Sequence, residues 1–222
     1  MFDAIAPRYD LLNHVLSAGI DKRWRARAIR SLHLTGRERV VDVCAGTADV
    51  ALQAAGAARV VGVDFAAAML RIGLQKVRAA GQGSRITLVH GDATSLPLGD
   101  RTVDAAAVAF GIRNVERPEL ACREMARALR PGGRLAILEF GVPRIPGIRT
   151  LYLWYFKYVL PLIGRSVSGH NAAYSYLPAS VGTFPPPAEF VQILERAGFV
   201  DVEAVPLTLG IVYLYTARKV SS

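Results

Sequence analysis

The fold is decided by the stretch Arg39-Val40-Val41-Asp42-Val43-Cys44-Ala45-Gly46-Thr47-Ala48-Asp49-Val50. It begins with β-branched and apolar residues, breaks at a short turn of small residues, and then returns to apolar residues. This order predicts a buried strand that passes through a tight turn into a helix, where backbone groups can closely approach a ligand. Because ligands of open α/β sheets bind at the carboxyl ends of such strands, we expect a ligand site at this turn.

The remainder of the chain repeats this alternation of strands and helices. Apolar runs predict strands at 40–44, 59–64, 85–89, 103–110, 134–140, 200–205 and 211–217, and helical patterns occupy 10–16, 20–32, 49–55, 66–80, 119–129 and 188–197. Such alternation favours an α/β fold with a parallel sheet and right-handed crossovers. No linker divides the chain, so we expect one domain over residues 1–222, with residues 141–184 as an insertion over the sheet edge.

The composition is that of a globular protein. Hydrophobic residues make up 52 % of the 222 residues and charged residues 20 %, which excludes a disordered chain. Cys44 and Cys122 show no spacing typical of a disulfide or zinc site, so we expect a reducing, cytoplasmic environment and no metal. No signal peptide is expected, and no stretch reaches the ~20 apolar residues that span a bilayer.

The chain is strongly basic, with a formal net charge of +9. Nucleic acid, an anionic membrane surface or an anionic ligand could each explain this charge. Much of the surplus lies in the early part of the chain, at Lys22, Arg23, Arg25, Arg27, Arg30, Arg37 and Arg39. A solvated helix face and a membrane-facing helix remain equally open. No nucleic-acid reading module is evident, so nucleic acid is not an expected partner.

Three positions follow successive predicted strands and together suggest a nucleoside site. Small residues at the turn 45–47 allow close approach of a ligand. Asp64 ends the second strand and could accept both hydroxyls of a ribose. Asp92-Ala93 follows the third strand and could meet the amine and ring nitrogen of adenine. The alternative for each aspartate is a helix cap or a turn former.

The turn lacks the Gly-x-Gly-x-x-Gly pattern of dinucleotide-binding folds. The chain also ends in two predicted strands, where a dehydrogenase would usually carry a substrate domain. Both observations favour a methyltransferase that uses S-adenosylmethionine over an oxidoreductase.

Motifs along almost the whole chain resemble the ubiquinone/menaquinone biosynthesis C-methyltransferases, which are class I S-adenosylmethionine-dependent enzymes. The matching segments are Phe2-Asp3-x-Ile5-Ala6-x-x-Tyr9-Asp10-Leu11-Leu12-Asn13, Leu16-Ser17-x-Gly19, Trp24, Phe110-Gly111-Ile112-Arg113-Asn114-Val115, Leu129-x-Pro131-Gly132-Gly133, Tyr174-x-Tyr176-Leu177-Pro178-x-Ser180-Val181 and Phe184-Pro185. The segment 110–115 is the most specific of them, and 129–133 occurs in many methyltransferases.

The resemblance implies a Rossmann-like, seven-stranded, mostly parallel sheet with helices on both faces and one antiparallel strand near the edge. It also implies an N-terminal helical lid at 1–36 and a substrate-covering insertion at 141–184. The cofactor-binding residues that we expect are Ala45, Gly46, Thr47, Asp64, Phe65, Asp92, Ala93, Ala109 and Tyr9. At Ala109 the family usually has a serine, so only the backbone could serve here.

The sequence departs from the family pattern at two further places. The first turn has Ala45 and Ala48 where the family has glycines, and an added methyl group narrows a turn that approaches a ligand. The family's Thr-Gly-Gly-Ile-Val-Ala-Leu-His becomes Thr208-Leu209-Gly210-Ile211-Val212-Tyr213-Leu214-Tyr215. If the family's histidine touches substrate, Tyr215 would have to replace it.

The implied reaction is methylation of a ring carbon on a prenylated quinol. Loss of a phenolic proton makes the adjacent ring carbon electron-rich, so a base or a cation that holds the phenolate is needed. We expect Arg113 to steady the phenolate and Asn114 to orient the ring or a water molecule. The alternative for Arg113 is a structural ion pair with an acid such as Glu139. Substrate-binding candidates are His170, Tyr174 and Tyr176, although a lone loop histidine is more often solvated.

The aromatic stretch 151–160 suits an isoprenoid tail, and with the basic helix it suggests peripheral membrane association at the inner face of the membrane. The same residues could instead pack over the sheet edge or form a homodimer interface. The segments Ser168-Gly169-His170 and Leu177-Pro178-x-Ser180 resemble the naphthoquinol type, which favours a demethylmenaquinol over a ubiquinone precursor. Two rivals remain open: a methyltransferase for another phenolic or lipid metabolite, and a non-catalytic cofactor-binding subunit of a quinone-synthesis complex.

Overall fold

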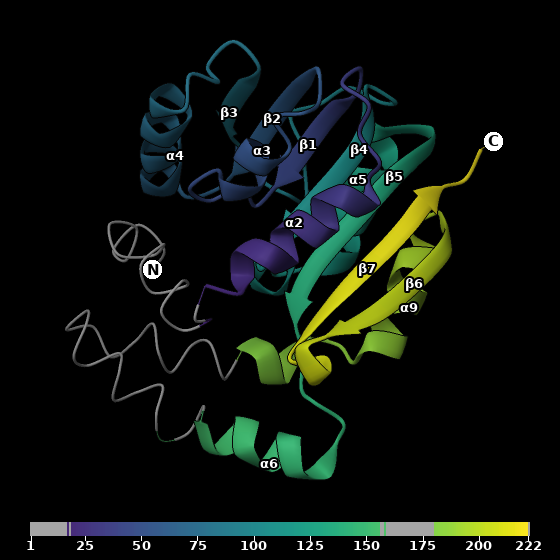
Figure 1. Ribbon diagram of the computed structural model, residues 1–222. Helices are drawn as coiled ribbons and strands as arrows, with labels where there is room; N and C mark the ends of the chain where they lie inside the picture. Colours follow the sequence, from purple (N-terminus) through teal and green to yellow (C-terminus); the bar gives the residue numbers. More distant parts are fainter. Residues whose placement is uncertain (1–16, 18, 156–157, 159–179, 222) are drawn as a thin grey trace.

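The computed structural model describes residue 17, residues 19–155, residue 158 and residues 180–221. Its seven-stranded sheet has the order β3-β2-β1-β4-β5-β7-β6 (Figure 1). The strands are β1 (Arg39–Val43), β2 (Arg59–Asp64), β3 (Ile86–His90), β4 (Val103–Ala109), β5 (Leu129–Phe140), β6 (Phe199–Leu207) and β7 (Val212–Lys219). The strands β1 to β5 pair in parallel, whereas β7 runs antiparallel to both β5 and β6. The predicted mostly parallel sheet with one antiparallel strand near the edge is confirmed.

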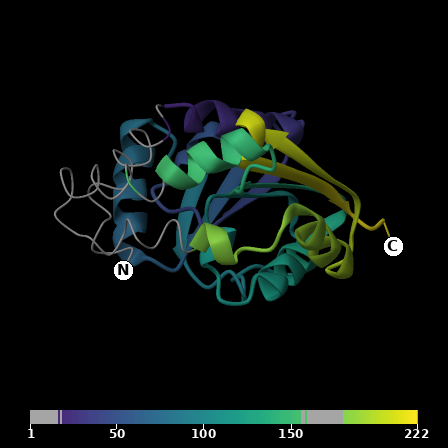
Figure 2. The ribbon, with the colours of Figure 1, turned by 90° about the horizontal axis from the view of Figure 1, so that it is seen from below.

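Helices cover both faces of the sheet, as Figure 2 shows end-on. The helices are α2 (Asp21–Ser31), α3 (Asp49–Gln53), α4 (Ala67–Ala79), α5 (Pro118–Ala128), α6 (Pro146–Trp154) and α9 (Pro187–Arg196), with short 3₁₀ helices η1 (Ile112–Asn114) and η3 (Thr208–Gly210). The helices α2 and α3 share one hydrophobic cluster with the sheet, and α5 and α9 share the other.

The two clusters follow from the period of two residues along each strand. In β4, Ala105 and Ala107 face the α2 side, whereas Ala106 and Val108 face the α5 side. All four are buried, because a parallel strand with helices on both faces has no solvated side. This is why β4 reads as a nearly unbroken apolar run.

One predicted boundary is wrong. The strand β5 begins at Leu129, whereas we predicted a helix through residue 129, a turn, and a strand from 134. Leu129 is fully buried and pairs with Val103, which draws the chain into the sheet immediately after α5. The Pro131-Gly132-Gly133 segment therefore forms an irregularity within the strand, where the register shifts and Gly132 adopts a φ of 73°.

The helix α2 forms the described part of the predicted lid and packs on the sheet. Trp24 is buried, donates from Nε1 to the Thr208 hydroxyl at 2.9 Å, and meets the rings of Phe110 and Phe140 edge-on. Ile20, which we placed on the same apolar stripe, is 37 % exposed. The predicted helix 10–16 lies outside the described residues. Among the described helices, none has the length and apolarity to cross a bilayer.

Candidate active site

A cavity of about 320 Å³ lies at the carboxyl ends of β1, β2 and β4. Seven of the predicted site residues line it: Gly46, Asp64, Phe65, Asp92, Ala93, Ala109 and Asn114. Ala45, Thr47 and Arg113 do not line it, although they belong to the same turns. Tyr9, His170, Tyr174 and Tyr176 lie outside the described residues. The structure thus brings together the strand-end positions that the sequence singled out.

The turn after β1 depends on left-handed backbone conformations at Cys44, Gly46 and Ala48, whose φ values are 57°, 53° and 67°. The methyl group of Ala48 is fully buried and faces Gly73 of α4, where an added Cβ would lie only 3.2 Å from it. Ala48 is absent from the cavity lining. The methyl group that Ala48 adds relative to the family's glycine therefore packs toward α4 and does not narrow the cavity.

Gly111, which follows β4, packs closely against Cys44 of this turn. A Cβ added at Gly111 would lie 2.3 Å from the Cβ of Cys44, so only glycine fits there. Burial raises the pKa of the Cys44 thiol well above its usual range, and the nearby Asp64 carboxylate adds to this. Cys44 therefore stays a neutral, unpaired thiol in the cavity wall.

The Asp64 side chain, at the end of β2, forms hydrogen bonds with the turn after β1 and with the residues that follow β2. Its Oδ2 accepts the Gly46 amide at 2.7 Å, and its Oδ1 accepts the Ala66 amide at 2.7 Å. Asp64 is not the N-cap of α4, because Ala66 holds that position, two residues further along the chain. Asp64 also lines the cavity, and a carboxylate is a strong acceptor for the hydroxyl groups of a ligand there.

Asp92 acts as a turn former and also lines the cavity. Its Oδ1 accepts the backbone amide of Thr94 at 2.7 Å and the Thr94 hydroxyl at 2.8 Å. These bonds hold the pKa of Asp92 below its usual value, so the carboxylate is ionised. Both interpretations of Asp92 from the sequence, turn former and candidate ligand contact, are compatible with this geometry.

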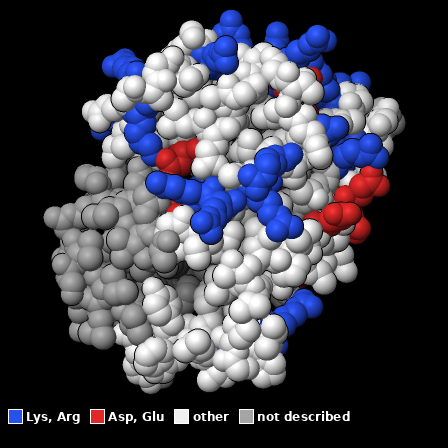
Figure 3. Space-filling view, viewed as in Figure 1, with Lys and Arg blue, Asp and Glu red and all other residues white. Residues whose placement is uncertain are grey.

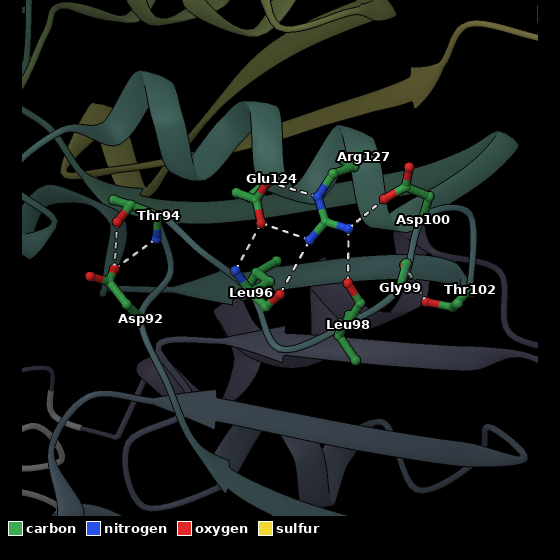
Figure 4. Close-up of polar contacts among 9 residues, drawn as sticks. All are labelled: Asp92, Thr94, Leu96, Leu98, Gly99, Asp100, Thr102, Glu124 and Arg127. Carbon is green, nitrogen blue, oxygen red and sulfur yellow. Dashed lines mark hydrogen bonds and ion pairs between the residues drawn. The ribbon is translucent and has the colours of Figure 1, made fainter.

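Two side chains of α5, Glu124 and Arg127, contact the loop that follows Asp92 and fix its position (Figure 4). The Arg127 guanidinium donates to the carbonyl groups of Leu96 (3.2 Å) and Leu98 (2.8 Å), and to Asp100 at 2.6 Å. Glu124 pairs with Arg127 at 2.7 Å and accepts the Leu96 amide at 2.8 Å. This network fixes the path of the chain between β3 and β4.

We expect Arg127→Ala to weaken the affinity for S-adenosylmethionine about fivefold, since roughly 1 kcal/mol of loop order is lost. Titration calorimetry measures the change. The matched control is Arg218→Ala, which removes an exposed ion pair with Asp201 at the far strands and should leave the affinity unchanged. Equal affinities for both variants would show that the network does not position this loop.

Asp42 is a buried carboxylate for which the sequence predicted no role. It lies inside β1 and is 1 % exposed. Its Oδ2 accepts the Ala51 amide at 2.9 Å, and its Oδ1 has no partner among the described residues. Burial raises the pKa of Asp42 to about 8, and the negative charge of Asp64 adds to the effect. An acid within an apolar strand was the signal that could have identified it.

The raised pKa predicts a pH dependence of stability. Between about pH 4 and pH 8 the folded chain keeps a proton on Asp42 that the unfolded chain releases. The free energy of unfolding should therefore fall as the pH rises through this window, by up to about 1.4 kcal/mol per pH unit. Asp42→Asn should remove this part of the slope in denaturant unfolding at several pH values. The same slope in variant and parent would contradict the assignment.

The end of β4 leads into η1, which carries Arg113 and Asn114. Arg113 is nearly buried and forms an ion pair with the fully buried Glu139 at 2.6 Å. Its Nη1 also donates to the Phe110 carbonyl at 2.6 Å, and its Nε donates to the Ser180 hydroxyl at 3.3 Å. The ion pair that we considered as the alternative for Arg113 is thus present. Asn114 lines the cavity directly.

Tyr215 does not take the place of the family's histidine in this cavity. It is 2 % exposed and packs edge-on against Phe190 of α9 with ring centroids 4.9 Å apart. Burial raises its pKa well above the usual range, so the phenol stays protonated. Tyr215 does not line this cavity, and the conditional substrate contact considered for it stays a prediction.

The sheet order and the cavity at the strand ends are those of the class I S-adenosylmethionine-dependent methyltransferase fold. The residues at the cavity fit an adenosyl cofactor, because the acid Asp64 ends β2 and small residues form the walls at Gly46, Ala93 and Ala109.

The chain belongs to the ubiE/COQ5 methyltransferase family, whose model matches residues 1–219. A relative from Syntrophotalea carbinolica, named ubiquinone/menaquinone biosynthesis C-methyltransferase UbiE, is 50 % identical over 99 % of this chain and 92 % of its own length. A demethylmenaquinone methyltransferase from Bacteroides fragilis is 40 % identical over 99 % of this chain and 91 % of its own length.

Solved structures show the same fold at low sequence identity. The [4+2]-cyclase SpnF superposes with a TM-score of 0.72 at 20 % identity, covering 100 % of this chain and 95 % of its own. A methyltransferase-like protein from Methanococcus maripaludis gives 0.70 at 18 % identity, with the same coverage. Because a cyclase shares the architecture, the fold alone does not specify methyl transfer.

Proposed function

We propose that this chain methylates a ring carbon of a prenylated quinol, with demethylmenaquinol as the preferred substrate. The observation that carries the proposal is that Asn114 of the segment 110–115 lines the same cavity as Asp64 and Asp92. The names of relatives that are 40 % and 50 % identical to the chain support the substrate class.

S-adenosylmethionine supplies a methyl group that is already activated on a sulfonium. The chain's own task is to bind it and to align the quinol. In the proposed arrangement Asp64 accepts the ribose hydroxyls, and Asp92 with the backbone of Ala93 meets the adenine. Ala109 contributes its backbone only.

The quinol must lose a phenolic proton before its ring carbon can attack. We assign to Asn114 the orientation of the ring, because its side chain lines the cavity. Arg113 does not line the cavity but directly precedes Asn114, and we assign to it the stabilisation of the phenolate, because a nearly buried cation acts strongly on a developing negative charge nearby. Glu139 keeps that cation in place. The substrate contacts proposed for His170, Tyr174 and Tyr176 complete the arrangement.

The substrate preference is tested with two reduced substrates that differ only in the ring, a demethylmenaquinol and a demethylubiquinol analogue with the same short tail. We expect kcat/KM to be at least about tenfold higher for the naphthoquinol. A higher kcat/KM for the benzoquinol would contradict demethylmenaquinol as the preferred substrate. Methylation of neither compound would favour the alternative that the substrate is another phenolic or lipid metabolite.

The non-catalytic alternative is weakened by one contact. It rested on the loss of glycines in the first turn, yet the methyl group of Ala48 packs toward Gly73 and not into the cavity. Methyl transfer decides between the two, since a chain that binds S-adenosylmethionine in calorimetry but transfers no methyl group to the quinol would favour the non-catalytic subunit.

We further propose that the chain is cytoplasmic and associates peripherally with the inner face of the membrane. A prenylated quinol resides in the bilayer, so the enzyme must meet it there. The net charge of +9 favours an anionic surface, and Figure 3 shows basic side chains gathered over α2. The exposed cations of α2 are Lys22, Arg23, Arg27 and Arg30. The alternative is that the aromatic stretch 151–160 forms a homodimer interface.

A further inference from the structure

The outer face of α6 is apolar and open. Leu151, Leu153 and Trp154 are 64 %, 47 % and 52 % exposed, whereas Tyr152 between them is buried and anchors the helix. Ile145, just before the helix, is also half exposed. Figure 1 shows α6 beyond the carboxyl end of β5, at the edge of the sheet where the cavity lies. Large side chains exposed on one helix face mark an interaction surface.

The 3₁₀ helix η3 carries one more exposed apolar side chain, Leu209, close to the segment that leads into α6. Leu209 is 61 % exposed and has a φ of 60°, a conformation that favours glycine. The Gly141 amide donates to the Ile211 carbonyl at 3.0 Å, and Pro143 lies against Gly210, so η3 adjoins the segment that enters α6.

The conformation and exposure of Leu209 do not stabilise the fold. Its backbone is strained, its side chain is mostly solvated, and the family pattern has glycine at the corresponding position. Strained residues persist where they serve a function. A leucine that costs stability and points into water is expected where it contacts something other than the chain itself.

The charge around this surface is of one sign. Residues 141–188 contain no Asp or Glu and four cations, Arg144, Arg149, Lys157 and Arg165. Arg144 and Arg149, which are described, are exposed beside the apolar residues. Apolar side chains flanked by cations without acids are typical of an element that lies in an anionic lipid interface.

We propose that Ile145, Leu151, Leu153, Trp154 and Leu209, which we call the α6–η3 surface, insert into an anionic bilayer and turn the cavity edge toward it. This inference rests on the membrane association proposed above and names the residues that make the contact. A second copy of the chain is the competing occupant, and the experiment separates the two.

The experiment uses flotation with vesicles of equal parts phosphatidylglycerol and phosphatidylcholine, and vesicles of phosphatidylcholine alone. We expect binding to the anionic vesicles only. Leu209→Gly should lower the partition coefficient about fivefold, and Leu151→Gln with Trp154→Gln more than about tenfold, because inserted apolar area is lost. The control Val200→Thr alters an exposed apolar residue at the far end of β6 and should have no effect.

A second readout separates insertion from damage to the fold. Leu209→Gly should raise the melting temperature, since it removes backbone strain, while it lowers vesicle binding. The chain has two tryptophans, and Trp24 is buried, so Trp154 should report insertion as a blue shift of fluorescence. Trp154→Phe should remove the shift.

Three results would overturn the inference: no flotation, equal binding by all variants, or a dimer in sedimentation that Leu151→Gln with Trp154→Gln dissociates. Turnover with a short-tailed quinol in detergent distinguishes this failure from failure of the proposed function. Turnover without flotation would refute the membrane association and the α6–η3 surface but not the proposed reaction, and flotation without turnover would refute only the proposed reaction.

Discussion

Replacement of Arg113 by methionine is expected to lower turnover of the quinol about a hundredfold to a thousandfold, because the phenolate loses its fixed cation. The same change leaves the Glu139 carboxylate buried without its partner, and Glu139 has no exposed surface. We therefore expect a loss of about 3 kcal/mol in the free energy of unfolding. Both quantities are measured on one preparation, by steady-state kinetics and by denaturant unfolding.

A double variant separates the two roles of Arg113. Arg113→Met with Glu139→Leu removes both charges, and an apolar pair in a buried place is often as stable as the ion pair it replaces. We expect the double variant to recover most of the lost stability and none of the turnover. If turnover returns together with stability, Arg113 has only the structural role. Arg130→Ala, which breaks a half-exposed pair with Asp104, is the control for stability and should cost less than about 1 kcal/mol.

Replacement of Asp64 by alanine is expected to weaken S-adenosylmethionine binding about a hundredfold. Two charge-assisted hydrogen bonds to the ribose contribute about 1.5 kcal/mol each. The variant also frees the amides of Gly46 and Ala66, which Asp64 holds at 2.7 Å. Titration calorimetry with the cofactor measures the loss.

Adenosine and 2′,3′-dideoxyadenosine distinguish ribose binding from support of the turn. The parent chain should prefer adenosine, and Asp64→Ala should bind both equally weakly. A variant that still prefers adenosine would place the ribose contact elsewhere. Asp104→Ala is the matched control, since Asp104 also accepts a backbone amide, that of Arg39 at 2.8 Å, and is absent from the cavity lining.

The fold was predictable because its central strands β1 and β4 are buried on both faces and its helices have an apolar stripe. Apolar runs such as 103–110 admit few other arrangements. The start of β5 was not predictable, because Pro131-Gly132-Gly133 has the composition of a turn. Only the pairing of Leu129 with Val103, a long-range contact, draws that segment into the sheet.

The candidate site was predictable where it depends on strand ends. Asp64, Asp92 and Asn114 come together because parallel strands end at one edge of the sheet. The role of Glu139 as the partner of Arg113 was foreseen only as an alternative, since two buried charges far apart in sequence are paired by tertiary structure alone. The strain at Leu209 could not be read from the sequence, because φ depends on the turn that the fold imposes.

Transfer of a deuterated methyl group tests the central claim most directly. The chain is incubated with S-adenosylmethionine carrying a CD₃ group and with reduced demethylmenaquinol, and the product is analysed by mass spectrometry and nuclear magnetic resonance. We expect the CD₃ group on the ring carbon beside the phenolic hydroxyl. A CD₃ group on a phenolic oxygen, or cofactor binding with no transfer to the quinol, would contradict quinol C-methylation.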